Sequence, residues 1–161
     1  MQSDDLIQQW KKAVSEKNLP NTDHFKTLPL AKAEKLDEEI LSLHNHYSEC
    51  IDCLSCANCC KTTVTVFNNE DVGRASRALA LSRKEFIKKY LIEDQGEYTT
   101  ISTPCPFLLP DNKCGIYEAR PHACRSFPHT GRPHFLNRLK AHQQNLRVCS
   151  ITYHVLKDYT T

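Results

Sequence analysis

Cysteine is the residue type in this sequence most able to do chemistry, and the chain of 161 residues has nine of them. The string CLSCANCC places four in the pattern C-x-x-C-x-x-C-C, at Cys53, Cys56, Cys59 and Cys60. Two residues between cysteines let a tight turn direct both sulfurs toward one metal ion or cluster. The string therefore predicts a metal site with thiolate ligands.

The adjacent pair Cys59 and Cys60 is the unusual part of this pattern. Successive side chains point to opposite sides of an extended backbone and lie about 100° apart on a helix. We therefore expect that the two thiols do not serve one metal in the same way. Two nearby sites are one interpretation, and one ligand beside a packed or reactive thiol is the other.

Three further cysteines, Cys105, Cys114 and Cys124, lie in a proline-rich stretch. Cys105 lies between two prolines, which fix the backbone and remove two amide donors. Cys114 precedes a glycine, which permits a tight turn and a close approach of the backbone. Cys149 stands apart from the others, and a lone cysteine is more often a small buried hydrophobic residue than a ligand.

Arg120 and Arg125 lie on either side of Cys124. Thiolate ligands carry negative charge and often need N–H groups and cations nearby to offset it. The two arginines are placed to supply that charge, which makes them candidates for supporting a bound cofactor. Pairing with surface carboxylates is the alternative interpretation.

Histidine and aromatic residues near Cys124 are weaker candidates. His122 and His129 are the two histidines that could act as ligands or proton carriers. The other histidines are expected to be structural or solvated. Tyr117 and Phe127 are expected to shield the site as core residues.

The cysteine run resembles a known family when it is taken with the strings that follow it, VTVFNNEDVGRAS, LSRKEFIKKYL and PCPFLLPDNKCGIYEARPHACRSFP. This is the CxxCxxCC family, also called YkgJ-like, whose members are described as zinc- or iron-chelating or Fe–S-cluster-containing proteins. The resemblance spans roughly residues 50 to 150 and places Arg120 and Arg125 in the family's RPxxCR string. Cys50 lies outside the family pattern. The resemblance implies eight metal ligands: Cys53, Cys56, Cys59, Cys60, Cys105, Cys114, Cys124 and Cys149.

The metal is the next question, and spacing favours no metal strongly. The C-x2-C-x2-C run and the proline after Cys105 are similar to ferredoxins, although the fourth ferredoxin cysteine comes three residues later, whereas Cys60 is adjacent. An all-cysteine zinc site would have paired knuckles, and Cys114 and Cys124 are far apart for a knuckle. We expect an iron–sulfur cluster or clusters used in electron transfer or redox sensing. A structural zinc module for protein interaction, non-haem iron and redox thiols are the alternatives.

An enzyme is a third class of function. The family domain also occurs in flagellin lysine N-methylases, so the resemblance admits a metal-dependent, protein-modifying methyltransferase relative. The four glycines of the chain form neither a G-x-G nucleotide loop nor a phosphate cradle. No spacing of serine, histidine and aspartate indicates a hydrolase. The sequence leaves open whether the protein is an enzyme and names no catalytic residue.

Composition limits the partners. A net charge of +2 and a pI near 8.1 lack the basic excess of nucleic-acid binders, so we expect no nucleic acid. Mean hydropathy is -0.53 and no apolar run approaches the roughly 20 residues of a membrane span. The acidic start lacks the features of a secretory signal, so we expect a cytoplasmic protein with reduced cysteines. Metal ions are the expected partners, and the sequence identifies neither a protein partner nor an oligomeric state.

The sequence predicts a mainly helical α+β fold, in which helices and a short strand pair surround a cysteine-rich loop system. Residues 1–49 are expected to form N-terminal helices that complete a core around Trp10. Residues 50–161 are expected to form the cysteine-cluster metal-binding domain, in one compact unit with the first part. Helices are predicted over residues 4–14 and 31–49, from an Asn69 cap, from the Ser82–Glu85 capping box to Leu91, and again from Phe135 onward. The predicted strands are Thr62–Phe67 and 97–102, and a helical turn is predicted at Ile116–Ala119.

Overall fold

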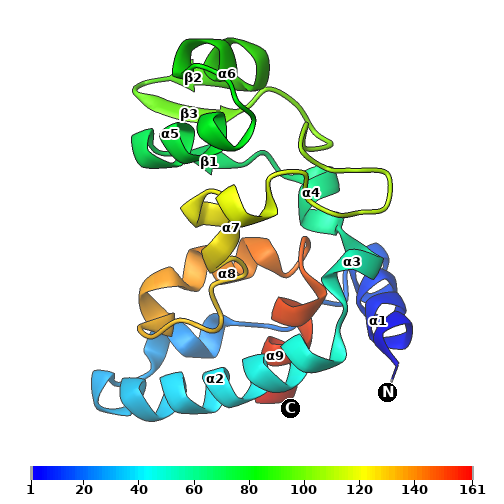
Figure 1. Ribbon diagram of the computed structural model, residues 1–161. Coiled ribbons are helices and arrows are strands. Elements are labelled where there is room, and N and C mark those ends of the chain that lie inside the picture. Colours follow the sequence, from blue (N-terminus) through cyan, green and yellow to red (C-terminus); the bar gives the residue numbers. More distant parts are fainter. Residues whose placement is uncertain (1, 161) are drawn as a thin grey trace. The chain divides into compact units, whose positions relative to one another are not determined.

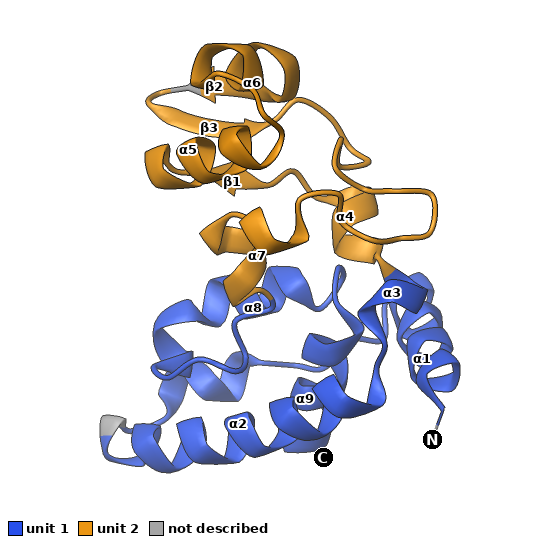
Figure 2. Ribbon diagram, in the orientation of Figure 1, with its two compact units in different colours: residues 1–56, 128–161 blue, residues 57–127 orange. Residues whose placement is uncertain are grey.

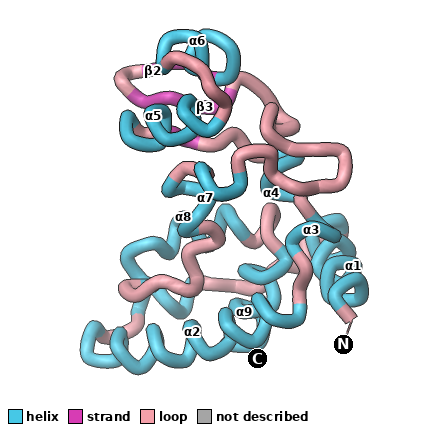
Figure 3. Tube along the Cα trace, viewed as in Figure 1, coloured by secondary structure: helices cyan, strands magenta, loops and turns pink. Residues whose placement is uncertain are grey.

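The computed structural model describes residues 2–160, apart from the side chains of Leu30 and Asp94. The chain forms two compact units, which are unit 1 (residues 1–56 and 128–161) and unit 2 (residues 57–127) (Figure 2). Most of the secondary structure is helical, and a small antiparallel sheet lies in unit 2 (Figure 3). The predicted mainly helical α+β class is therefore confirmed. The division at residue 50 into two parts of one compact whole stays a prediction.

Unit 1 contains the long helices of the chain (Figure 1). The predicted helices near both ends of the sequence are confirmed. The elements of this unit are α1 (Ser3–Ser15), α2 (Ala33–Cys50), α3 (Cys53–Cys56), α8 (Leu139–Asn145) and α9 (Ser150–Thr160), with the short 3-10 helices η1 (Asp23–Thr27), η2 (Leu30–Lys32) and η4 (Phe135–Arg138). Within residues 2–160, no helix combines the length and the apolar character that crossing a membrane requires.

The core of unit 1 forms where α9 packs against α1, α2 and α8. Leu6, Ile7 and Trp10 occupy one face of α1 and are almost completely buried, as their helical spacing predicts. The indole N–H of Trp10 donates to the backbone carbonyl of Leu146 at 2.8 Å. This bond satisfies the polar end of a buried aromatic residue. The predicted core around Trp10 is therefore confirmed.

Unit 2 contains the sheet and several short helices. In chain order its elements are α4 (Asn58–Thr62), β1 (Val66–Phe67), α5 (Asn69–Ala78), α6 (Arg83–Tyr90), β2 (Leu91–Asp94), β3 (Glu97–Thr100), η3 (Tyr117–Ala119) and α7 (His122–Ser126). The predicted helical turn near residue 117 is confirmed as η3. The helix α7 lies in a stretch that the sequence analysis assigned to a loop.

The sheet has three antiparallel strands in the order β1–β3–β2, rather than the predicted pair. The prediction was wrong at Leu91, which we assigned to the end of a helix and which instead begins β2 opposite Thr100. Leu91, Phe67 and Thr100 are buried on one face, while Val66 and Ile92 are exposed on the other. Burial alternates along each strand, so that one face of the sheet is buried. At Leu91 this burial stabilises the strand more than the local helical propensity stabilises a helix.

Two helix starts in unit 2 depend on side-chain caps. The predicted capping box of α6 is confirmed, because Ser82 and Glu85 each accept the backbone N–H of the other. The predicted cap of α5 was wrong by one position. Asn68, with extended backbone angles, caps α5, and its side chain accepts the N–H of Asp71 at 2.8 Å. Asn69 is the first helical residue instead.

The core of unit 2 is aromatic. Phe67, Phe86 and Phe107 are buried together, and the rings of Phe86 and Phe107 stack with centroids 5.8 Å apart. Two cysteines, Cys105 and Cys114, pack against the edge of this cluster. The hydrophobic core therefore fixes the segment from which two of the predicted ligands come.

Candidate metal centre

The C-x-x-C-x-x-C-C motif forms two short helical turns, one in each unit. Cys53 and Cys56 are the two ends of α3, and they belong to unit 1. Cys59 and Cys60 lie on α4, which belongs to unit 2. Ala57, between the turns, has a left-handed backbone with φ of 45°. This uncommon conformation for a residue with a side chain ends one turn and begins the next.

The adjacent cysteines of α4 interact with each other. Their sulfur atoms are 4.0 Å apart. The hydrogen bond from Cys59 is the main reason that the pKa of Cys60 falls to about 7, and the positive charges of Arg120 and Lys61 act in the same direction. Burial opposes them. Cys60 therefore becomes a thiolate more readily than Cys105, Cys114 and Cys124, whose pKa values are raised.

Cys105 is tied directly to α4 through the backbone. Its N–H donates to the carbonyl of Cys60 at 2.7 Å. Because Cys105 lies between two prolines, its N–H is the only backbone donor of the three residues. The predicted rigid P-C-P loop therefore has one donor, and that donor holds Cys105 beside Cys60.

A tight reversal of the chain brings Cys114 back to Cys105. Cys114 pairs with Leu108 in an isolated antiparallel bridge, and the N–H of Gly115 donates to the carbonyl of Phe107 at 2.8 Å. The Phe107 N–H bonds to the sulfur of Cys105, and the Ile116 N–H bonds to the sulfur of Cys114. Backbone N–H groups aimed at sulfur favour the thiolate form that a metal requires.

Cys124 is the fourth member of a cluster of unit 2 thiols that also contains Cys60, Cys105 and Cys114. It lies on α7, and its sulfur is 3.7 Å from the hydroxyl oxygen of Thr65. Thr65 directly precedes β1, so this contact joins α7 to the sheet. Cys124 is only partly exposed, like the other thiols of the cluster.

The four thiols Cys60, Cys105, Cys114 and Cys124 influence one another electrostatically. Burial raises the pKa of Cys105 to about 11, and the other three thiolates add to this effect. Burial also raises the pKa values of Cys114 and Cys124, again with contributions from neighbouring thiolates. Such a group cannot carry several negative charges unless a cation compensates for them. Without such a cation, the raised pKa values keep Cys105, Cys114 and Cys124 protonated.

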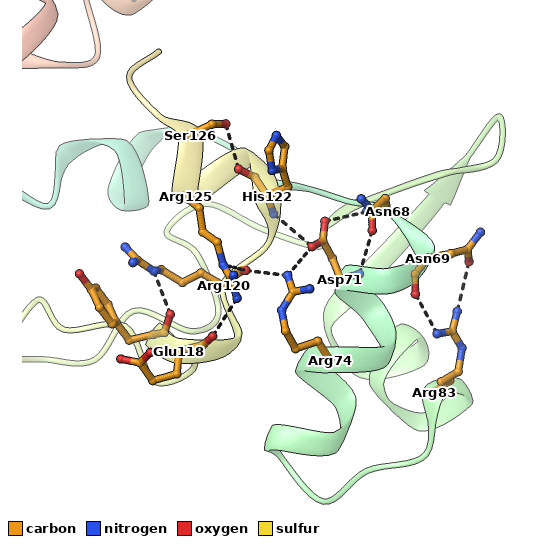
Figure 4. A network of polar contacts seen from close by, with 11 residues as sticks. Asn68, Asn69, Asp71, Arg74, Arg83, Glu118, Arg120, His122, Arg125 and Ser126 are labelled. Carbon is orange, nitrogen blue, oxygen red and sulfur yellow. Dashed lines mark hydrogen bonds and ion pairs between the residues drawn. The ribbon is translucent and has the colours of Figure 1, made fainter. Parts of the chain in front are cut away.

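The two arginines predicted near the site have different roles (Figure 4). The charge of Arg120 favours the thiolate forms of Cys60, Cys114 and Cys124. Arg125 instead donates to two backbone carbonyls, those of Glu118 and Arg120, each at 2.9 Å. In the part of the chain that the structure describes, neither arginine forms an ion pair with a carboxylate.

Tyr117 does not shield the site as a core residue. Its side chain is 52% exposed, and the Arg120 guanidinium lies over its ring at 3.5 Å from the centroid. Tyr117, the first residue of η3, can hold the arginine by this cation–π contact and still face solvent. The prediction of a core role for Tyr117 was therefore wrong, and the ring positions Arg120.

The cysteines of unit 1 lie in different surroundings. Cys149 is buried directly before α9, and the N–H groups of Thr152 and Ile151 bond to its sulfur. Burial raises its pKa to about 11, and the thiolate of Cys53 adds to this effect, so these two thiols share a neighbourhood. Cys50, the cysteine outside the family pattern, lies on α2 with its sulfur 3.9 Å from His46 Nε2.

The two candidate histidines belong to different units. His122 is exposed, and its backbone N–H donates to Asp71 Oδ1 at 3.1 Å. His129 belongs to unit 1, where its charge contributes to lowering the pKa of the buried His142. The ligand role of both rings stays a prediction. Asp71, which binds this N–H, was not among the site residues predicted from the sequence.

The donor chemistry of the cluster fits a metal centre. Four thiolates suit zinc or an iron–sulfur cluster, because soft sulfur ligands select these metals. Among the residues that the structure describes, no three His, Cys, Asp or Glu side chains already form a group able to hold a metal ion. The four thiols would therefore have to come closer together to hold a metal.

Comparison with known proteins identifies the family. Residues 52–150 match the CxxCxxCC family, which carries the description "Putative zinc- or iron-chelating domain". No curated protein and no solved structure matches the chain. The matched range covers more than half of the sequence and includes every cysteine from Cys53 to Cys149. The chain therefore belongs to the CxxCxxCC family of zinc- or iron-chelating domains.

Proposed function

We propose that this protein holds an iron–sulfur cluster through the four thiols of unit 2 and uses it in electron transfer or redox sensing in the cytoplasm. The observation that carries the proposal is that α4, a tight loop and α7 bring Cys60, Cys105, Cys114 and Cys124 into one region of unit 2. The N–H of Cys105 donates to the carbonyl of Cys60 at 2.7 Å, and neighbouring thiolates contribute to the raised pKa values of the other three thiols. Four thiolates are the usual ligand set of such clusters.

The surroundings of the four thiols support this proposal. Backbone N–H groups bond to Cys105 and Cys114, and the hydroxyl of Thr65 lies beside Cys124. Hydrogen bonds to cluster sulfurs and nearby charge tune the reduction potential of iron–sulfur proteins. Arg120 supplies the positive charge at this position.

A bound cluster would supply one-electron chemistry, and the protein would supply its ligands and its environment. All four thiols are partly exposed rather than deeply buried. A redox centre near the surface can exchange electrons with a partner at short range, so this burial suits a carrier or a sensor. The half-buried position would also let an oxidant reach the centre.

The remaining cysteines of the family pattern, Cys53, Cys56, Cys59 and Cys149, stay proposed metal ligands. Within unit 1, the contribution of the Cys53 charge to the raised pKa of Cys149 supports this assignment for those two. Cys50 is not part of the proposal.

Structural zinc is the second candidate. The observation in its favour is that the sulfurs of Cys105 and Cys114 each accept an N–H from the residue two positions later. Such turns also suit tetrahedral zinc sites, which are closed and carry no redox chemistry. In that case the module would serve protein contacts rather than electron transfer.

The test is the metal and acid-labile sulfide content of the full chain purified without oxygen, together with its absorbance between about 300 and 600 nm. Iron with matching sulfide and a brown colour that bleaches on reduction is the expected result. Zinc without sulfide would overturn the iron–sulfur proposal and support the structural module. A chain that contains neither iron nor zinc would contradict both candidate functions.

A further inference from the structure

The helix that carries Cys124 has no cap of its own. Its N-cap residue, Pro121, offers neither a side-chain acceptor nor a backbone N–H. The first N–H groups of any helix lack partners within the helix. In α7 the N–H of His122 is bound by Oδ1 of Asp71, at 3.1 Å, from 51 positions earlier in the chain. A side chain of α5 therefore performs the capping of α7.

The same carboxylate holds several other groups (Figure 4). Asp71 is 3% exposed, and its Oδ2 accepts the N–H of Asn68 at 3.2 Å. Its Oδ1 also accepts Arg74 Nη2 at 2.5 Å, and that nitrogen donates in turn to the carbonyl of Arg120 at 2.8 Å. Asp71 and Arg74 together thus bind the backbone on both sides of Pro121, immediately before α7.

These contacts affect Cys124, the proposed metal ligand, through a very short helix. α7 has only five residues, and Cys124 lies in its middle. A helix of that length has little stability of its own, so its position depends on contacts with its neighbours. Within unit 2, α7 packs against β1 and η3 packs against α5. The polar contacts of Asp71 are the ones that fix where α7 starts.

We propose that Asp71 is a positioning residue for the metal centre. Its carboxylate fixes the start of α7 and thereby directs Cys124 toward the other three thiols of the unit 2 cluster. This inference rests on the proposed four-thiol centre and adds a carboxylate from outside the cysteine motifs. Outer groups that orient ligands affect metal affinity nearly as strongly as the ligands themselves.

The experiment is a Co²⁺ titration of the reduced, metal-free full chain, followed by the thiolate-to-cobalt charge-transfer absorbance. Asp71→Asn keeps the size of the side chain and removes its charge, and we expect at least about tenfold weaker binding with a smaller charge-transfer band. Asn68→Ala is the matched control, because it removes the cap of α5 without touching the Asp71–His122 bond. That control keeps the wild-type band.

A second variant removes the donor of this hydrogen bond instead of the charge on its acceptor. His122→Pro deletes the N–H that Asp71 binds, at the first helical position, where proline is tolerated. It leaves Asp71 and the cap of α5 intact, and comparison with His122→Ala, which loses the ring but keeps the N–H, isolates the same contact even if Asp71→Asn does not fold. We expect the same loss of cobalt affinity and absorbance.

A double-mutant cycle separates positioning from general stability. In a Cys124→Ser background, Asp71→Asn should have no further effect on the cobalt spectrum, because the ligand that it positions is gone. An additive effect, or wild-type binding by both Asp71→Asn and His122→Pro, overturns the inference. If the wild-type chain itself shows no thiolate-to-cobalt band, the proposed centre fails independently of Asp71.

Discussion

The amide of Cys105 donates to the carbonyl of Cys60 at 2.7 Å, which joins the proline-rich loop to the end of the C-x-x-C-x-x-C-C motif. This one backbone bond places two thiols together that are far apart in the sequence. Cys114 follows through the chain reversal after Cys105, and Cys124 follows through α7. The grouping of the four thiols thus depends on backbone contacts of the proline-rich loop and on the position of α7.

Mutation should distinguish the effect of Arg120 on the pKa of Cys60 from the effect of Arg125 on stability. Arg120→Gln removes a charge that, after the Cys59 hydrogen bond, lowers the pKa of Cys60. We expect the midpoint pH for alkylation of Cys60 in the metal-free chain to rise above about 7. Arg125→Gln should leave this midpoint unchanged and lower stability by about 1 kcal/mol, because Arg125 bonds carbonyls at an exposed position. Equal midpoint shifts in both variants would contradict the division of roles.

Metal removal should loosen the loop between β3 and α7 more than the rest of the chain. Metal that binds only the folded form stabilises it, by about 2.7 kcal/mol at a hundredfold excess over the dissociation constant. Hydrogen exchange in peptides covering residues 105–124 should become at least about tenfold faster after chelation. Peptides from α2 provide the comparison. Unchanged exchange in the 105–124 peptides would show that these cysteines hold no metal.

Cys149 should contribute to stability even without metal. Its buried sulfur accepts two N–H groups at the start of α9, as a helix cap does. Cys149→Ala should therefore destabilise the metal-free, reduced chain by about 1–2 kcal/mol in urea unfolding. Cys53→Ala, at an exposed position, should change stability by less than about 0.5 kcal/mol. Equal effects of the two substitutions would argue against a capping role for Cys149.

His142 should make the protein sensitive to mild acid. Burial, with the charges of Arg138 and His129, lowers its pKa from 6.5 to about 4. The unfolded chain binds this proton below about pH 6.5 and the folded chain does not, so the stabilisation is present above that pH and is lost as the pH falls toward 4. Between pH 7.5 and 5 the wild type should lose about 2 kcal/mol more than His142→Leu.

The control for this prediction is His24→Gln, a substitution of an exposed histidine in the same unit. That variant should lose stability with falling pH as the wild type does. Urea unfolding of the metal-free chain at the two pH values measures all three proteins without the effect of metal release. Parallel losses in the wild type and His142→Leu would show that His142 does not cause the acid sensitivity.

The features that the sequence predicted correctly are those that depend on residues close together in the chain. The apolar spacing around Trp10 predicted α1 and its buried face, and the Ser82–Glu85 pair predicted the start of α6. Both signals are complete within a few residues. The helix end at Leu91 was wrong because pairing with β3 determines the conformation there. Pairing partners are set by the whole fold rather than by local propensity.

The candidate site shows the same limit. The sequence and the family resemblance identified the cysteines as metal ligands, but their spacing alone did not show which thiols lie together. The grouping follows from the Cys60–Cys105 bond and from the chain reversal at Cys114. Asp71 resembled an ordinary acidic residue at a helix start, and only its contact with the N–H of His122 connects it to the site.

The most direct test of the central claim measures metal bound per chain in anaerobically purified Cys114→Ser, Cys124→Ser and Cys50→Ser proteins. If Cys60, Cys105, Cys114 and Cys124 hold one centre, the first two variants should lose the same share of metal and of visible absorbance. Cys50→Ser, which changes a cysteine outside the cluster, should match the wild type. Full metal content and an unchanged spectrum in both Cys114→Ser and Cys124→Ser would contradict the four-thiol centre.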